Sequence, residues 1–375
     1  MRIGILTVPF NNNYGGYLQS YALMTVLKRM GHEPAIIMRR HQKPKVSITY
    51  RIKYFIKGVI KTLVRRRHYP CFYDVENHFW QRGKDMQLFL NNNIQPQTKY
   101  IYSTEQLRKE CEGKFDAYIV GSDQVWRPIY VPGIVSNMYL DFTEGWNVKR
   151  IAYAASFGTD NPEYTAEEIE RCGKLIEKFD AVSVRERSGL QVINDFNWNV
   201  EEPQVVLDPT LLLTKDDYNK ALPQENKFAK GKIFCYVLDN SDEAKLAISN
   251  IQCQLNRPLY EIADIQKGDS VLPSIGTWLT AIRDSDFVIT DSFHGTVFSI
   301  IFNKPFAVYV NKSRGASRFE GLLGQFGLRD HIITDSFDLK RILELGWASV
   351  NKTIFNKTSE CKVFLDNALN SKYGK

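Results

Sequence analysis

The chain has 375 residues, of which 43% are hydrophobic and 24% are charged; this composition is typical of a globular protein and excludes a disordered or fibrous one. At about 100–200 residues per domain, the length predicts two domains. The formal net charge of +7 comes from one basic segment, residues 39–67, and the rest of the chain is slightly acidic, which argues against nucleic acid as a partner.

The first predicted elements form an N-terminal domain, residues 1–220. Apolar strands alternate with helices there, which predicts a parallel sheet with both faces covered. The expected strands are residues 3–8, 33–38, 117–120, 150–156, 181–184 and 204–207. The expected helices are residues 17–30, 166–178 and 188–196. The apolar run at the N-terminus is too short for a signal peptide, so we expect a cytoplasmic protein.

The basic segment interrupts this domain as an insertion of about residues 39–70, bracketed by Pro44 and Pro70. Apolar residues recur in it at the spacing of one helix face: Ile52, Phe55, Ile56, Val59, Ile60 and Leu63. Lysines occupy another face of the same predicted helix, residues 51–64. Such a helix can pack on its own domain, lie on an anionic membrane surface, or bind a partner protein or nucleic acid. The sequence leaves these alternatives open.

The C-terminal domain is expected at residues 228–350, after a polar linker at residues 214–231. Its predicted strands are residues 232–238, 259–263, 287–290 and 306–310. Its predicted helices are residues 243–255, 275–283, 294–302 and 339–345. A last helix, within residues 356–375, is expected to pack back on the first domain. The alternation predicts an α/β protein of two Rossmann-like domains facing a cleft, with ligands beyond the carboxyl ends of the strands.

Polar residues follow the first strand at the start of the first helix. Asparagines and paired glycines permit a close backbone approach, and a helix start offers free N–H groups to an anion or a sugar hydroxyl. The candidate ligand-binding residues of this loop are Asn12, Asn13, Tyr14, Gly15 and Gln19. The alternative is a plain structural turn.

Two later strand ends carry charged groups. Asp123 is a candidate for hydrogen-bonding a sugar, and Trp126 is a candidate for stacking on one. Arg185 ends another strand, and an arginine fork suits carboxylate or phosphate oxygens. A capped turn with a buried tryptophan and a structural Arg–Glu pair are the respective alternatives.

The strand at residues 287–290 leads into Ser292, His294, Gly295 and Thr296. His294 would lie at a strand end and a helix N-terminus, at the expected cleft. That position favours anions and suits a histidine that transfers protons. We therefore expect His294 to be catalytic and its neighbours to bind an anionic substrate.

Motifs for dinucleotides, P-loop phosphates, zinc and serine hydrolases are absent from the sequence. Asp284 and Asp286 form a D-x-D pattern, but they precede a strand, whereas ligand-binding acids usually follow one. We expect no metal and no bound cofactor.

Six segments, taken in order, resemble the polysaccharide pyruvyl transferase family. They are residues 4–22 with the Asn-Tyr-Gly loop, 116–126 (D-A-Y-I-V-G-S-D-Q-V-W), 149–158 (K-R-I-A-Y-A-A-S-F-G), 182–189 (V-S-V-R-E-R-S-G), 205–211 (V-V-L-D-P-T-L) and 290–305 (T-D-S-F-H-G-T-V-F-S-I-I-F-N-K-P). The resemblance implies a glycosyltransferase-B-like fold. It also implies transfer of the pyruvyl group of phosphoenolpyruvate, as co-substrate, onto two hydroxyls of a sugar as a cyclic ketal.

The resemblance further implies that His294 is the catalytic histidine and Arg185 a donor-binding arginine. Several members have an arginine two residues before the histidine, where this chain has Ser292. Arg314 and Arg318 are the candidates to replace that contact. In the implied reaction, Asp123 would activate the acceptor hydroxyl, and Trp126 and the ligand-binding residues of the first loop would bind the acceptor sugar. If the acceptor sugar is lipid-linked, the helix at residues 51–64 would hold the protein at the inner membrane face. The competing functions are a nucleotide-sugar-dependent glycosyltransferase of the same fold and a non-catalytic glycan-binding protein.

Overall fold

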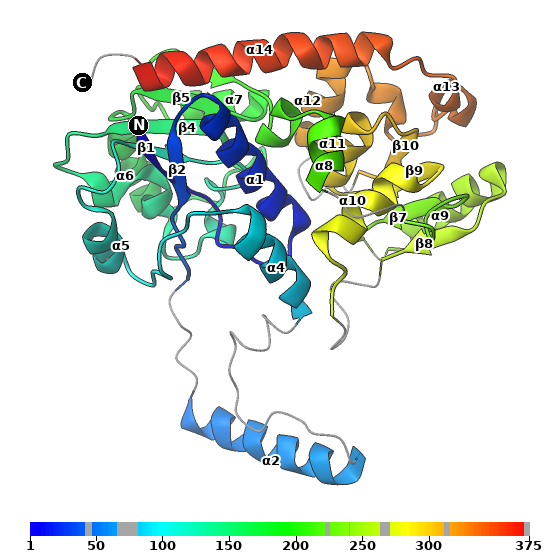
Figure 1. Ribbon diagram of the computed structural model, residues 1–375, viewed down its shortest axis with the longest axis horizontal. Coiled ribbons are helices and arrows are strands. Elements are labelled where there is room, and N and C mark those ends of the chain that lie inside the picture. Colours follow the sequence, from blue (N-terminus) through cyan, green and yellow to red (C-terminus); the bar gives the residue numbers. More distant parts are fainter. Residues whose placement is uncertain are drawn as a thin grey trace.

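The computed structural model describes residues 1–41, 47–65, 82–221, 226–239, 241–262, 271–310 and 316–370. Two parallel sheets, each flanked by helices, lie side by side in it (Figure 1). This arrangement confirms the predicted α/β fold of two Rossmann-like domains.

The first sheet has six strands in the order β2-β1-β3-β4-β5-β6, and every neighbouring pair is parallel. Its strands are β1 (Arg2–Leu6), β2 (Glu33–Ile36), β3 (Ala117–Val120), β4 (Lys149–Ala155), β5 (Ala181–Val184) and β6 (Gln204–Val205). The helices of this domain are α1 (Tyr14–Arg29), α4 (Lys84–Asn93), α5 (Thr104–Cys111), α6 (Ala166–Ile176) and α7 (Arg187–Asp195). All four residues of β3 are buried, because helices cover both faces of the sheet.

The second sheet has four parallel strands in the order β10-β9-β7-β8. They are β7 (Ile233–Tyr236), β8 (Leu259–Glu261), β9 (Phe287–Thr290) and β10 (Phe306–Val308). The helices are α9 (Asp242–Leu255), α10 (Ile275–Asp284), α11 (Phe293–Ile301), α12 (Ala316–Phe326) and α13 (Leu339–Leu343). Because both sheets are parallel, each presents its strand ends, and the loops that follow them, at a single edge.

The segment predicted as a linker contains a helix, α8 (Lys215–Ala221). Thr214 and Asp217 stabilise its start by reciprocal backbone hydrogen bonds, and Asp217 also pairs with Arg29 of α1 at 2.6 Å. Tyr218 is buried and donates a hydrogen bond to the Thr210 carbonyl at 2.9 Å. The prediction of a linker here was wrong, because it rested on the polar composition alone. The capping hydrogen bonds and the buried Tyr218 stabilise a helix in spite of that composition.

The C-terminal helix is longer than predicted: α14 spans Ala348–Asn370 and begins before the expected segment, residues 356–375. It crosses from the second domain to the first (Figure 1). Lys149 Nζ of β4 donates a hydrogen bond to the Ala368 carbonyl at 3.2 Å, and the Phe364 ring lies 6.2 Å from that of Tyr153. The helix thus packs on the first sheet and straps the two domains together.

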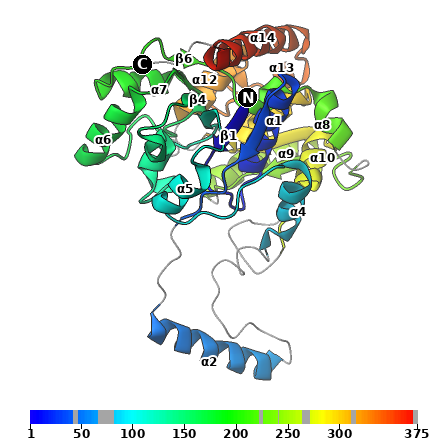
Figure 2. The same ribbon diagram turned by 60° about the vertical axis from the view of Figure 1, so that its left-hand side comes forward.

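Helix α2 (Ile48–Arg65) covers the described part of the basic insertion. It stands apart from both domains in the two ribbon views (Figure 1, Figure 2). Within the described residues, no helix combines the length and the apolar character that crossing a bilayer requires.

Candidate functional site

A cleft of about 460 Å³ opens where the carboxyl ends of the two sheets face each other. Loops from both domains line it: Asn12, Asn13, Asp123, Gln124, Arg127, Ile129 and Tyr130 from the first, and Tyr236, Leu238, Asp291, Ser292, Phe293, His294, Arg318 and Phe319 from the second. The location agrees with the rule that parallel sheets bind ligands beyond their carboxyl ends.

His294 comes from the second domain, at the second position of α11. Ser292 caps this helix, and its hydroxyl accepts a hydrogen bond from the Gly295 N–H at 3.3 Å. The imidazole reaches across to the first domain, where it lies against Gly15. A Cβ atom on Gly15 would come within 1.9 Å of His294 Nδ1, so only glycine fits at that position.

Asp208 of the first domain faces this histidine from the loop after β6. His294 Nε2 lies 3.6 Å from Asp208 Oδ2, an ionic contact longer than a hydrogen bond. The second carboxylate oxygen accepts hydrogen bonds from the backbone N–H and the hydroxyl of Thr210, at 3.0 and 2.7 Å. Burial alone would raise the pKa of Asp208, but His294, Arg185 and these hydrogen bonds outweigh burial and hold the pKa well below its ordinary value. Asp208 is therefore an anion in the folded protein.

Arg185 lies beneath the cleft rather than on its wall. Its guanidinium contacts three carboxylates, with Asp123 at 3.3 Å, Asp208 at 3.2 Å and Glu186 at 3.4 Å. The Phe293 ring covers it, 4.1 Å from Cζ. The structure therefore contains the structural Arg–Glu pair that the sequence analysis gave as the alternative. It adds two further carboxylates to that pair, so that Arg185 neutralises a cluster of three buried acids.

Two other arginines line the cleft itself. Arg318 of α12 is 9% exposed, and burial, together with the charge of Arg185, lowers its pKa. Arg127 follows β3 and is held by Glu163 at 2.9 Å. An anion placed between them would offset the unfavourable burial of positive charge. Arg314, the other candidate, lies outside the described residues.

Three buried polar atoms around the cleft have no hydrogen-bond partner among the described residues. They are Nε2 of His294, Nη2 of Arg185 and Oδ1 of Asn12. An unsatisfied buried polar group costs about 1–3 kcal/mol, and most buried groups in folded proteins are satisfied. Because these three atoms lie together at the cleft, the cleft is the candidate ligand site.

The structure separates the candidate acceptor residues of the first loop into two groups. Asn12 and Asn13 line the cleft. Tyr14 is buried, stacks on Trp278 with ring centroids 5.1 Å apart and donates a hydrogen bond to the Pro273 carbonyl. Gln19 is fully buried and bonds Thr7 and the Ser122 backbone. Tyr14 and Gln19 therefore stabilise packing inside the protein, and their side chains are not placed to contact an acceptor.

Trp126 also departs from its expected role. Its ring is fully buried and stacks on Tyr139, with nearly parallel ring planes and centroids 5.1 Å apart, and its Nε1 donates a hydrogen bond to the Met138 carbonyl at 3.0 Å. The alternative of a capped turn with a buried tryptophan is the observed one. Stacking on a sugar would require unpacking this core.

The expected anion donors at Gly295 and Thr296 are already engaged. The Gly295 N–H pairs with the Ser292 hydroxyl, and the Thr296 N–H pairs with the Ser292 carbonyl at 2.9 Å. Both residues are buried beneath the start of α11. These N–H groups are therefore not free for an anion, and the positively charged side chains that line the cleft belong to Arg127 and Arg318.

Asp208 and Arg127 were not among the residues singled out from the sequence. Asp208 belongs to the V-V-L-D-P-T-L stretch and directly follows a strand, which was the available signal. The D-x-D acids serve structural roles: Asp284 accepts from the Asn226 N–H at 2.6 Å, and Asp286 pairs with Arg257 at 3.2 Å. In the described part of the chain, no group of three or more acids, histidines or cysteines is placed to hold a metal.

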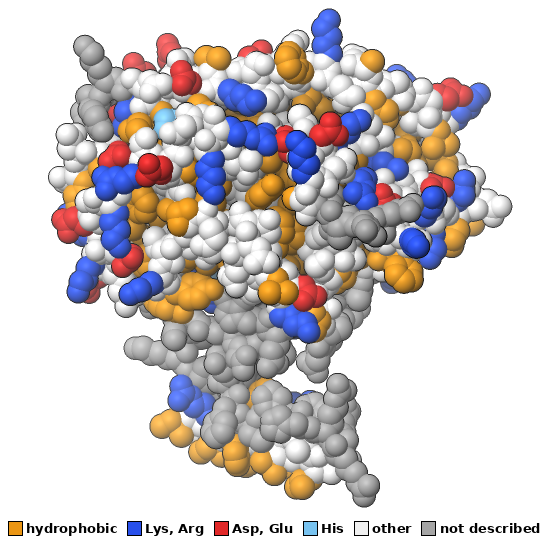
Figure 3. Space-filling view, in the orientation of Figure 1, with side chains coloured by type: hydrophobic (Ala, Val, Ile, Leu, Met, Phe, Trp, Pro, Cys, Tyr) orange, Lys and Arg blue, Asp and Glu red, His pale blue; other side chains and the backbone are white. Residues whose placement is uncertain are grey.

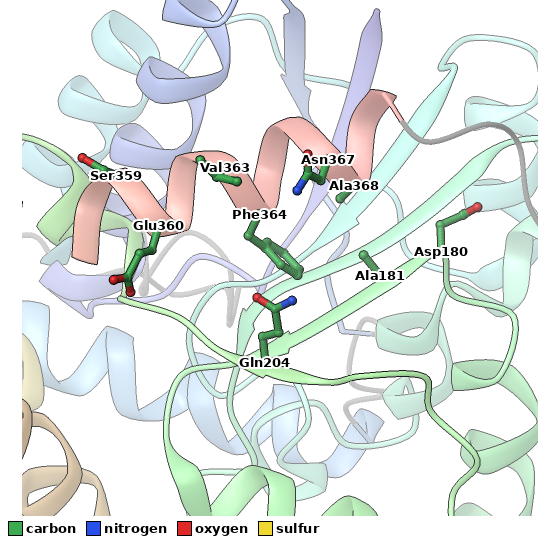
Figure 4. Close-up of a pocket in the computed structure, with 9 residues that line it drawn as sticks. All are labelled: Asp180, Ala181, Gln204, Ser359, Glu360, Val363, Phe364, Asn367 and Ala368. Atoms are coloured by element: carbon green, nitrogen blue, oxygen red, sulfur yellow. The ribbon is translucent and has the colours of Figure 1, made fainter. Parts of the chain in front are cut away.

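A larger hollow of about 740 Å³ lies elsewhere, between α14 and the strand edge of the first sheet (Figure 4). Phe364 and Gln204 face each other across it, and its charged lining residues are two acids, Asp180 and Glu360. It contains no basic group to bind an anion. Although this hollow is larger, we do not consider it a candidate site for an anionic ligand. The cleft, which is lined by arginines and a histidine, is the better candidate.

The sequence model of the family described as polysaccharide pyruvyl transferase matches residues 13–313 of the chain. That match covers most of the chain and includes Asp123, Arg127 and His294 of the cleft, whereas Asn12 and Arg318 lie just outside it. The chain therefore belongs to the polysaccharide pyruvyl transferase family. No curated protein sequence matches it.

Solved structures support the fold. The UDP-GlcNAc 2-epimerase from Neisseria meningitidis bound to UDP-GlcNAc aligns with a TM-score of 0.52 and 9% identity, over 98% of this chain and 99% of the other. A putative UDP-N-acetylglucosamine 2-epimerase from Listeria monocytogenes aligns with a TM-score of 0.53 and 9% identity, over 97% and 91%. At this identity the likeness shows only the fold, which is glycosyltransferase-B-like, as the resemblance implied.

Proposed function

We propose that this member of the polysaccharide pyruvyl transferase family transfers the pyruvyl group of phosphoenolpyruvate onto two hydroxyls of one sugar. The product is a cyclic pyruvate ketal, and phosphate is released. The observation that carries the proposal is the set of unpartnered polar atoms around a cleft lined by Arg127, Arg318 and His294. Phosphoenolpyruvate is small and carries both a carboxylate and a phosphate, which are the groups that arginines bind best.

In the proposed reaction, a proton is added to C3 of phosphoenolpyruvate and C2 becomes electrophilic. A sugar hydroxyl attacks C2, the C2–O bond to phosphate breaks, and a second hydroxyl of the same sugar closes the ketal. Two hydroxyl protons are lost; one balances the proton gained at C3 and the other leaves with phosphate. The residues must therefore move protons and stabilise the departing phosphate.

His294 is assigned the proton transfer. Its Nε2 has no hydrogen-bond partner in the described chain and faces the Asp208 carboxylate at 3.6 Å. Asp208 acts as a positioning residue, because its negative charge stabilises the imidazole when it takes up a proton. Arg318 and Arg127 are assigned to the anionic donor. Asp123 lines the cleft but is engaged by Arg185 at 3.3 Å, so its role in activating the acceptor hydroxyl is the least supported.

The donor assignment is tested by thermal shift with phosphoenolpyruvate on wild type and Arg318→Gln. Losing a charge-assisted hydrogen bond weakens binding by about 10- to 100-fold, so the titration midpoint rises by that factor. Each midpoint is compared with the ligand-free protein of the same variant. Arg341→Gln is the matched control, because Arg341 is exposed on α13 and paired with Asp330; its midpoint stays at the wild-type value.

The catalytic assignment is tested by phosphate release over a panel of mono- and oligosaccharide acceptors. His294→Gln binds phosphoenolpyruvate but releases phosphate about 10²–10⁴-fold more slowly. Full activity in this variant would remove His294 from the mechanism. A panel of nucleotide sugars run in parallel separates the alternatives: a shift with a nucleotide sugar and none with phosphoenolpyruvate indicates a glycosyltransferase. Binding of glycans without turnover indicates a non-catalytic protein.

A further inference from the structure

Helix α2 exposes a continuous row of large apolar side chains. The exposed fractions are 75% for Ile48, 54% for Ile52, 51% for Ile56, 54% for Ile60 and 73% for Leu63. These residues recur every three or four positions and so share one helix face. In the space-filling view, the apolar side chains of α2 line the edge that faces away from the two domains (Figure 3). The alternative in which this face packs on its own domain does not hold.

The charge of the helix is of one sign. Residues 48–65 contain five basic residues and no acidic one, and Arg51 and Lys53 flank the apolar face on its two sides. Long basic side chains next to an apolar face can extend their charges to the phosphates of a bilayer while their stems remain in the apolar layer. A free helix of this length is marginally stable in water, so a surface that covers its apolar face would also stabilise it.

We infer that α2 is a docking element for an anionic lipid surface, on which it lies parallel to the bilayer with Ile52, Ile56 and Ile60 inserted. The basic residues supply the attraction to negative headgroups and the apolar row supplies the insertion. The protein would then be held at a membrane surface rather than in bulk solution. This inference is independent of the proposed reaction, because it concerns binding to lipid alone.

Charge decides between a lipid surface and a second copy of the helix. Two copies packed through the apolar row would bring five positive charges on each helix close together, with no acid on α2 to compensate them. Nucleic acid would pair with the charges but would leave the apolar row in water. An anionic bilayer satisfies both features at once, and we therefore commit to it.

The experiment is co-sedimentation of the full chain with vesicles of phosphatidylcholine, with and without phosphatidylglycerol. Wild type is expected to bind the mixed vesicles, and binding weakens as salt is raised. Lys53→Gln combined with Lys57→Gln reduces the partition coefficient by about 25-fold, at about fivefold per charge. Ile52→Asp combined with Ile56→Asp reduces it by more than about 100-fold, because two apolar side chains no longer insert.

Matched controls lie on α14. Phe355 is 72% exposed there, and Phe355→Asp leaves vesicle binding unchanged. Lys352→Gln combined with Lys362→Gln removes the same charge as the α2 pair and also leaves binding unchanged. Equal binding to neutral vesicles, or binding that survives both α2 double variants, would overturn the inference. So would a dimer in lipid-free solution that the Ile52→Asp, Ile56→Asp variant converts to monomer, because the apolar row would then cover a second copy.

Discussion

The cleft and α2 are opposite exceptions to the usual distribution of charged and apolar side chains. Folded proteins keep charges outside and large apolar side chains inside, yet the floor of the cleft buries Arg185 and Asp208, whereas α2 exposes Ile52 and Leu63. The buried charges find partners within the chain, since Arg185 contacts three carboxylates. For the apolar row we propose a partner outside the chain. Changes in the cleft should therefore alter folding and binding together, whereas changes on α2 should leave folding intact.

We expect the largest effect on stability from removing Arg185, the cation that the buried carboxylates share. Arg185→Ala leaves Asp123, Asp208 and Glu186 without their shared cation, and breaking a buried ion pair costs about 3–5 kcal/mol. The free energy of unfolding, measured in denaturant, should fall by that amount. Lys174→Ala removes one partner of the exposed Glu170–Lys174 pair and should leave the free energy of unfolding almost unchanged. Equal effects in the two variants would mean that the cluster is not a stabilising unit.

His331 is a buried titratable group whose hydrogen-bond partner is a backbone carbonyl rather than a carboxylate, and burial lowers its pKa to about 4. The unfolded chain takes up a proton near pH 6.5 whereas the folded chain does not, so stability is lost as the pH falls from about 6.5 to 4. The expected loss is on the order of 3 kcal/mol. His331→Asn retains a donor for the Phe306 carbonyl, 2.9 Å from Nδ1, and should flatten this part of the pH profile. An unchanged profile would assign the acid sensitivity to other groups.

A pair of adjacent glycines tests how tightly the two domains meet. Gly15→Ala places a methyl group on His294, and overpacking of this kind costs about 1–3 kcal/mol. We expect weaker phosphoenolpyruvate binding and a lower melting temperature. A Cβ on Gly16 meets nothing within 4 Å, so Gly16→Ala is neutral or slightly stabilising in the helix. If both variants behave alike, His294 does not rest against Gly15 in solution.

The smallest expected effect is on α2. Ile52→Asp should change the free energy of unfolding by less than about 0.5 kcal/mol, because the side chain is already exposed. Ile282→Asp on α10 is the contrasting variant: Ile282 is fully buried, and a buried unpaired charge should prevent stable folding. A large loss of stability from Ile52→Asp would show that the apolar row packs within the protein.

Strand periodicity was enough to predict the two sheets and the edge at which the cleft lies, because parallel strands place their following loops together. It also placed His294 there. Trp126 and Gln19 were predicted to bind the acceptor, but both side chains are buried in the core. A polar or aromatic residue beside a ligand loop looks the same in the sequence whether its side chain turns inward or outward. Asp208 was missed because its importance depends on a partner 86 positions along the chain, His294 of the other domain.

The two residues of the Asp208–His294 pair come from different domains, and this affects when proton transfer can occur. Asp208 belongs to one domain and His294 to the other, with 3.6 Å between their charged atoms. Any hinge motion that widens the cleft to admit substrate also disconnects the histidine from its carboxylate. Under the proposed function, proton transfer is then confined to the arrangement in which the two domains hold this pair together. An open protein would leave phosphoenolpyruvate intact and would not hydrolyse it before the sugar arrives.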